Sequence, residues 1–344
     1  MCRSLRIDAR TVDALSLPPV LYLGADRPVE ASEVPPQAFA FAGITEPREL
    51  EAVERLTACG ARVHAVLAAP REKMLAHWRS AHGAEWEQRL AATIDAAYET
   101  SVALGFLESE DLWCDAYVGA MAIGLSRLAA RRLDCEWRPV GVDSTATRDL
   151  VPSVSPQSIT ASGMLFTRRF AGVIFADFAG FSRLPDSELP VFWAYFMRAI
   201  GERLAPLRSH ILLQRTWGDA LHLVLSSARA TAEAACAIQA CLEELHLPGA
   251  LAGLELRLAA HYAPVFSGQD PVEEAGTFFG TQLSFTARIE PVTPPGMIFV
   301  TEAFAAQLAL EAPDRFVLEY AGAVRLAKGY GESRLFSLRA AGSD

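Results

Sequence analysis

FADFAGFS, residues 175–182, follows a short β-branched and aromatic run, which predicts a strand ending at Asp177 beside a glycine-containing turn. TWGDA, residues 216–220, lies between two apolar runs and predicts a hairpin whose turn carries Gly218 and Asp219. If the two strands are neighbours, both carboxylates meet at one end of a sheet. Paired divalent cations bridged by acidic oxygens could be held there, although each aspartate alone could equally cap a turn.

Further motifs follow in a fixed order. Residues 215–219 read R-T-W-G-D, and residues 257–265 read R-L-A-A-H-Y-A-P-V. Residues 280–288 read G-T-Q-L-S-F-T-A-R, followed by P-G-M-I-F-V at 295–300 and L-A-K-G-Y at 326–330. With the first stretch, they resemble the class III nucleotidyl cyclase catalytic domain from Phe170 to Leu338, about half of the chain. Each motif is weak alone, and the ordered set is specific.

The resemblance implies a catalytic site that uses metal ions. Asp177 and Asp219, with the carbonyl of Phe178, would hold two Mg²⁺ or Mn²⁺ ions per active site. Backbone N–H groups at four positions made accessible by a glycine would cradle the β- and γ-phosphates: Ala179, Gly180, Phe181 and Ser182.

Three further positions complete the expected site. Lys328 would pair with the terminal phosphate of the substrate, and Arg288 with the α-phosphate in the transition state. Ser284 stands where most members of the family have an asparagine that orients the ribose. A hydroxyl keeps a donor there but has less reach, so either a water fills the gap or turnover is slow.

Arg215 and Thr277 occupy the two positions that read the base in the family, and this pair fits neither the adenylyl nor the guanylyl pattern. Arginine only donates hydrogen bonds, while threonine donates or accepts. The pair could meet adenine or, as in the bacterial anti-phage pyrimidine cyclases, uracil. Guanine is least favoured because no acidic residue stands at position 215. ATP is therefore the favoured substrate, with UTP or CTP as the alternative.

Composition limits the kinds of partner. The chain has 344 residues, 51% of them hydrophobic and 21% charged, with a net charge of −10. An acidic chain is not expected to bind nucleic acid. The six cysteines form no C-x-x-C pair, as expected for free thiols in a reducing compartment. No signal peptide and no apolar run long enough to span a membrane are evident, so a cytoplasmic protein is expected.

The domain organisation follows from pattern and composition. Residues 1–145 alternate apolar strands with helical patterns, which predicts a Rossmann-like parallel α/β domain, regulatory or sensory by analogy only. One long helix is expected from about Glu72 to Leu104. Residues 146–168 are rich in Ser, Thr and Pro and read as a linker. Residues 169–340 are expected to form the catalytic domain, with a helix over about 277–290.

The order of strand and helix patterns over residues 169–340 predicts a ferredoxin-like α+β fold of order βαββαβ. Its helices would lie on one side of an antiparallel sheet. In the resembling family, two such domains share their active sites, which implies a homodimer. The predicted activity is conversion of a nucleoside triphosphate to a 3′,5′-cyclic nucleotide and pyrophosphate. A degenerate module that only binds nucleotide is the second hypothesis. A scaffold without enzymatic activity would leave Gly180 and Gly218 unexplained.

Overall fold

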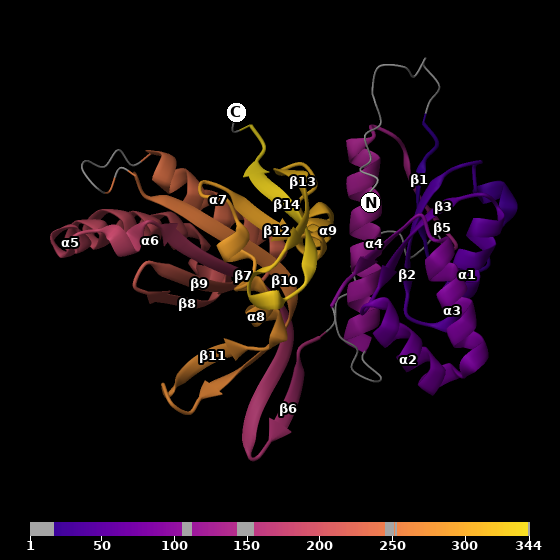
Figure 1. Ribbon diagram of the computed structural model, residues 1–344, viewed down its shortest axis with the longest axis horizontal. Helices are drawn as coiled ribbons and strands as arrows, with labels where there is room; N and C mark the ends of the chain where they lie inside the picture. Colours follow the sequence, from indigo (N-terminus) through magenta and orange to yellow (C-terminus); the bar gives the residue numbers. More distant parts are fainter. Residues whose placement is uncertain (1–16, 105–111, 143–154, 245–250, 252, 343–344) are drawn as a thin grey trace.

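The computed structural model describes residues 17–104, 112–142, 155–244, 251 and 253–342. Two β-sheets organise these residues, and Figure 1 shows helix α4 between the N-terminal sheet and the C-terminal part of the molecule. No helix of the described residues is long and apolar enough to cross a membrane.

The N-terminal sheet has five parallel strands in the order β4-β3-β2-β1-β5. The strands are β1 Val20–Leu23, β2 Phe39–Ile44, β3 Arg62–Leu67, β4 Glu99–Val102 and β5 Trp137–Val140. The helices are α1 Pro47–Ala58, α2 Arg71–His82, α3 Ala84–Ala96 and α4 Leu112–Arg132. The expected parallel α/β class is present. A single 3₁₀ turn, Ala31–Glu33, joins β1 to β2 where a Rossmann fold would have its first helix, so the narrower prediction is not confirmed.

The long helix expected between Glu72 and Leu104 is wrong. Gly83 has a φ of +99° and ends α2, so α3 starts in a new direction. Strand β4 then occupies part of the range assigned to helix. A continuous helical pattern hides such a break when a single glycine interrupts it.

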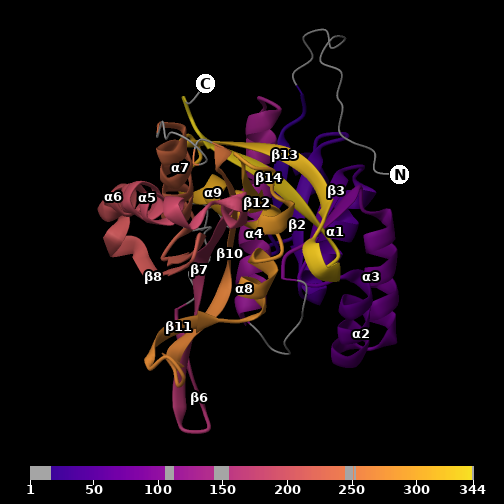
Figure 2. The ribbon, with the colours of Figure 1, turned by 60° about the vertical axis from the view of Figure 1, so that its left-hand side comes forward.

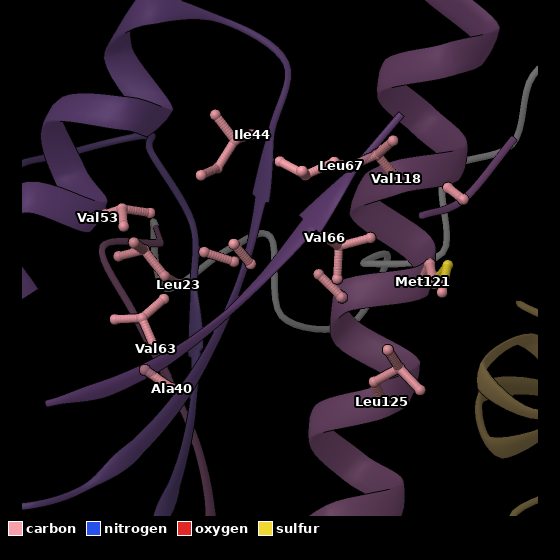
Figure 3. Close-up of a cluster of buried hydrophobic side chains, with 14 of the residues drawn as sticks. Leu23, Ala40, Ile44, Val53, Val63, Val66, Leu67, Val118, Met121 and Leu125 are labelled. Atoms are coloured by element: carbon pink, nitrogen blue, oxygen red, sulfur yellow. The ribbon is translucent and has the colours of Figure 1, made fainter. Parts of the chain in front are cut away.

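Helix α4 covers one face of this sheet. Its residues Val118, Met121 and Leu125 recur at three- and four-residue intervals and belong to the same buried cluster as Val66 of β3, which Figure 3 shows. All four side chains are buried. Figure 1 shows α1, α2 and α3 on the opposite side of the sheet.

The C-terminal sheet runs β13-β14-β12-β10-β7-β9-β8, with β6 paired to β7 and β11 paired to β10. Its strands are β6 Gln157–Ala161, β7 Met164–Ala179, β8 Ile211–Trp217, β9 Ala220–Leu225, β10 Glu255–Asp270, β11 Ala275–Phe279, β12 Ile298–Thr301, β13 Phe316–Arg325 and β14 Glu332–Ala340. Its α-helices are α5 Leu189–Phe192, α6 Arg198–Leu204, α7 Ala228–Glu244, α8 Thr281–Thr286 and α9 Glu302–Glu311.

The predicted βαββαβ order is present. Strand β7, helices α5 and α6, the β8–β9 hairpin, helix α7 and strand β10 follow one another, and the four strands are antiparallel neighbours in the order β10-β7-β9-β8. Figure 2 shows α5, α6 and α7 together on one side of this sheet.

Two local expectations for the C-terminal unit need correction. The predicted linker over residues 146–168 contains β6 and the start of β7 from Gln157 onward, while residues 146–154 lie outside the described part. The helix expected over 277–290 is instead strand β11 followed by the short helix α8, because Gly280, at a φ of +135°, separates them.

Helix α9 joins the two units. It is buried from Glu302 to Ala309, because α4 lies on one side of it and the C-terminal sheet on the other (Figure 1). The helices cross closely at Gly124, where an added β-carbon would lie 2.1 Å from the backbone oxygen of Ala306. A glycine is required at this crossing.

Candidate active site

Asp177 and Asp219 lie side by side at one end of the sheet. The pairing of β7 with β9 ends at Ala176 opposite Leu221, one residue before Asp177 and two after Asp219. Burial and the neighbouring Asp177 carboxylate raise the pKa of Asp219 to about 6, against hydrogen bonds from its own backbone N–H and that of Phe178. The long-range contact expected from the two motifs is therefore present.

The hairpin turn places Asp219 by local conformation. Gly218 has a φ of +62°, in the left-handed region that favours glycine, between the last residue of β8 and Asp219. Gly180 has a φ of +93° just after β7. Each aspartate thus has a glycine turn next to it, which sets the direction of the chain at the strand ends.

Arg257 of β10 belongs to the same cluster, and sequence reasoning gave it no role. Its Nη2 donates to Asp177 Oδ2 at 2.7 Å. Its Nε lies 3.0 Å from Glu290 Oε1, an ion pair without hydrogen-bond geometry. Arg257 opens the third motif, but only the register of β10 against β7 shows that it lies opposite Asp177.

Glu290 is the third carboxylate near the pair. Burial raises the pKa of Glu290 to about 7. The positive charge of Arg257 lowers this pKa, while the negative charges of Asp177 and Asp219 raise it further. The end of the sheet therefore concentrates negative charge, with a single guanidinium between Asp177 and Glu290. Such an arrangement favours a bound cation.

Arg288 and Lys328 form a second group. The carbonyl of Arg288 accepts a hydrogen bond from Ala327 N at 3.3 Å, so the loop that carries Lys328 is fastened to Arg288. The Arg288 guanidinium lies 5.3 Å from the centre of the Tyr330 ring, and its Nε is buried without a hydrogen-bond partner. Lys328 is exposed, with a φ of +57°. Both cations could therefore bind an anion.

Arg215 and Thr277 come together in a third group. Arg215 of β8 pairs with the carboxylate of Glu273 and donates to the carbonyl of Gly276 at 3.2 Å. Thr277 follows that glycine in β11, where it pairs with Gly268. Glu273 was not predicted, and no motif marks it, since it lies in the turn between β10 and β11.

The expected phosphate cradle forms a tight turn. Residues Phe181–Arg183 make a 3₁₀ turn closed by Arg183 N bonding to the Gly180 carbonyl at 3.0 Å. A β-carbon on Gly180 would lie 3.0 Å from the Arg183 guanidinium, so this cation, which was not predicted, lies over the glycine. The Phe178 side chain packs in the core against Phe192 and Phe196, which leaves only its backbone available to a ligand.

The first two groups make no direct polar contact with each other in the described part of the chain. In the described part of the chain, no hydrogen bond or ion pair joins Asp177 or Asp219 to Arg288 or Lys328. Ser284 is exposed on α8, two residues after the buried Gln282. The structure thus brings Asp177 close to Asp219, Arg288 close to the loop of Lys328, and Arg215 close to Thr277.

The donor set suits a hard cation that also binds substrate. The described residues contain no cluster of three or more His, Cys, Asp or Glu side chains able to hold a metal. Mg²⁺ is usually bound by one or two carboxylates together with substrate phosphates and water, and the two aspartates match that pattern. Arg257 already occupies one oxygen of Asp177.

No family model and no curated protein matches the chain. Solved structures do match. They include the adenylyl cyclase CyaB from P. aeruginosa, at 14% identity and a TM-score of 0.41, over 50% of this chain and 95% of that chain. The guanylate cyclase domain of RhGC from Catenaria anguillulae, in complex with GTP, matches at 16% identity and 0.42, over 50% and 96%. An adenylate cyclase from Trypanosoma brucei matches at 19% and 0.43, over 49% and 89%.

The chain is thus similar over about half its length to adenylyl and guanylyl cyclase catalytic domains. At these identities and TM-scores, the similarity says nothing about substrate or metal dependence.

Proposed function

We propose that this protein is a metal-dependent nucleotidyl cyclase that converts a nucleoside triphosphate to a 3′,5′-cyclic nucleotide and pyrophosphate. The observation that carries the proposal is the juxtaposition of Asp177 and Asp219 at the end of the C-terminal sheet, beside the half-buried Glu290. The Asp177 carboxylate raises the pKa of Asp219 although Arg257 already pairs with Asp177, so a further cation at the two aspartates would relieve their repulsion. The sequence motifs around them supply the rest of the expected site.

Asp177, Asp219 and the Phe178 carbonyl would hold two Mg²⁺ or Mn²⁺ ions, which make the ribose 3′-hydroxyl more acidic and neutralise phosphate charge. Arg288 would bind the α-phosphate, because its buried Nε has no protein partner. Lys328, exposed on the neighbouring loop, would bind the terminal phosphate. Ser284 would contact the ribose directly or through a water.

ATP is the favoured substrate. Arg215, which pairs with Glu273, presents hydrogen-bond donors that suit the N1 acceptor of adenine. Uracil and cytosine also present acceptors, so a pyrimidine triphosphate is the alternative. The lack of a direct polar contact between the aspartates and Arg288 or Lys328 in the described residues is consistent with a homodimer in which each site takes the two aspartates from one subunit and the two cations from the other, as the resemblance implies.

The test is to incubate the purified protein with Mn²⁺ and each of ATP, GTP, UTP and CTP, and to identify products by mass. We expect a cyclic product, with most from ATP. Asp219→Asn keeps the shape of the side chain and should lower turnover at least about 100-fold. Asp186→Asn, at an exposed acidic residue outside the cluster, is the matched control and should leave turnover unchanged.

Each result would lead to a different conclusion. Nucleotide binding without any cyclic product would favour the binding-module hypothesis. Product that persists in Asp219→Asn would show that the assignment of the metal site is wrong. Product from UTP or CTP in preference to ATP would overturn the substrate assignment.

A further inference from the structure

Strand β4, the edge strand of the N-terminal sheet, is fastened to the C-terminal unit at three places. The carboxylate of Glu99 pairs with Arg334 of β14, and the hydroxyl of Ser101 bonds to Glu302 of α9. Two residues beyond β4, the carbonyl of Leu104 accepts a hydrogen bond from Gln282 Nε2 at 3.1 Å. The third contact differs from the others because it reaches α8, the helix that carries Ser284.

Gln282 begins a chain of hydrogen bonds through the C-terminal core. Its Oε1 lies 2.9 Å from His261 Nε2, and His261 Nδ1 lies 2.8 Å from Thr301 Oγ1. Thr301 Oγ1 in turn accepts the Phe304 N–H at 3.1 Å and caps α9. Gln282, His261 and Thr301 are at most 4% exposed. An unmade bond among them is costly because water cannot replace it.

One assignment of protons satisfies the whole chain. The Gln282 amide donates to Leu104 and accepts from His261 Nε2–H. His261 Nδ1 then accepts from the Thr301 hydroxyl, whose oxygen remains free to accept from Phe304. His261 is neutral in this arrangement, in keeping with a pKa that burial lowers to about 4. Both ends of the Gln282 amide are thus used, one toward each unit.

Helix α8 depends on such contacts for its position. It has six residues, too few for a helix to be stable alone. Leu283 packs in a small apolar cluster, and Phe285 lies edge-on to His261 with ring centres 5.3 Å apart. Gln282 adds the polar contact that reaches across to the N-terminal unit. A displacement of Leu104 would leave the amide without its acceptor unless α8 moved as well.

We propose that Gln282 is a positioning residue that ties α8 to the end of strand β4, so that the N-terminal unit sets where Ser284 and Arg288 stand. The assignment of catalytic roles to those two residues rests on the proposed function. The tie between α8 and β4 rests only on the hydrogen bonds of Gln282. A change in the N-terminal sheet would reach the active site through Leu104 and this amide.

Gln282→Met tests the tie, since methionine keeps the length of the side chain and removes both hydrogen bonds. The matched control is Gln307→Met in α9, another buried glutamine, whose Nε2 donates to Glu311 Oε1 at 2.8 Å within its own helix. Hydrogen–deuterium exchange of the full chain should become at least about 10-fold faster at the amides of residues 284–289 in Gln282→Met and stay unchanged in Gln307→Met.

Steady-state kinetics supply the second readout. We expect kcat to fall about 10- to 100-fold in Gln282→Met with little change in KM, because a catalytic group displaced by about 1 Å costs rate more than binding. Gln307→Met should keep the wild-type kcat. Gln282→Leu loses the same bonds with a different shape and takes the place of methionine if that variant does not fold.

The two readouts separate this inference from the proposed function. Unchanged exchange at residues 284–289 in Gln282→Met would overturn the tie. Faster exchange with an unchanged kcat in an active enzyme would overturn the positioning role. A wild type that cyclises no nucleotide would refute the proposed function, while the exchange result would still decide whether the Gln282 amide holds α8 in place.

Discussion

At the scale of single residues, the site depends on how negative charge is balanced at the end of the sheet. Asp177, Asp219 and Glu290 gather there, and Arg257 lies between two of them. Removing one partner of a partly buried ion pair leaves the other charge without compensation. Arg257 therefore stabilises the site when no cation is bound, and a bound metal ion would reduce the need for it.

Arg257→Met should lower the free energy of unfolding by about 1 to 3 kcal/mol, because Asp177 and Glu290 lose their shared guanidinium. Addition of Mn²⁺ should then raise the melting temperature of the variant more than that of the wild type. Thermal unfolding with and without Mn²⁺ measures both effects. Equal Mn²⁺-induced shifts in the two proteins would contradict the proposed cation site.

At the scale of elements, short-range patterns predicted most helices and strands, and single glycines decided where several of them end. Gly83 separates α2 from α3, and Gly280 separates β11 from α8. The helical period of apolar residues continues across such a glycine in the sequence, although the helical backbone conformation stops there.

Strand β10 carries His261 opposite Val173 of β7, and this histidine is buried in the core.

Stability should fall in acid partly through His261. Burial lowers its folded-state pKa from 6.5 to about 4, so its neutral form stabilises the fold above about pH 6.5. That contribution, about 3 kcal/mol, is lost as pH falls from 6.5 through 4. His261→Gln should lower stability at pH 7 yet weaken its dependence on pH between 6.5 and 4. Urea unfolding across that range checks this, and an unaltered slope would contradict it.

At the scale of the whole molecule, the two units are joined by helix packing as well as by polar contacts. Helices α4 and α9 approach at Gly124, and the core cluster of the N-terminal unit includes Ala303 and Ala306 of α9. Stacked rings of Tyr117, Phe170 and Tyr262 extend the apolar contact, and the Tyr117 hydroxyl donates to the Tyr262 carbonyl. Because α9 packs against both α4 and the C-terminal sheet, a displacement of α4 would be transmitted to that sheet through α9.

Two glycines of α4 give a matched test of this joint. Gly124→Ala should lower the free energy of unfolding by about 1 to 3 kcal/mol, because its β-carbon would meet the backbone of Ala306. At Gly119, an added β-carbon would have no other atom within 4 Å. Gly119→Ala should therefore raise the free energy of unfolding by up to about 1 kcal/mol, because alanine has the higher helix propensity. Chemical denaturation measures both changes. Equal effects would show that α4 and α9 do not approach each other closely at Gly124.

Mixed dimers test the proposed shared site. Asp177→Ala and Arg288→Ala proteins should each be inactive, yet a mixed dimer has one intact site if the two residues come from different subunits. Random exchange makes about half of the dimers mixed, which should restore about a quarter of wild-type activity. Activity is measured after subunit exchange has been verified. No recovery would argue that the site lies within one chain or that the pairing of residues between subunits is different.

The predictions from the sequence succeeded where the signal was local. The apolar runs around Asp177 and Asp219 predicted the strand end and the hairpin, and the βαββαβ order followed from strand and helix patterns. Residues 157–168 were taken for a linker, because polar and small residues on an exposed hairpin have no core-facing period. Arg257, Glu290 and Glu273 were missed as site residues, because nothing near them in the sequence marks the groups they meet.

By itself, the sequence determined the strand and hairpin around Asp177 and Asp219, the two glycine turns and the presence of the acidic and basic residues, because these depend on each residue and its near neighbours. Only the tertiary structure decided that Arg257 meets Asp177, that Gln282 spans the two units and that α4 lies on α9. Those contacts join residues that lie 80 to 182 positions apart in the sequence. Such residues meet because the helices and sheets pack closely against one another, which the local conformational preferences of each residue do not determine.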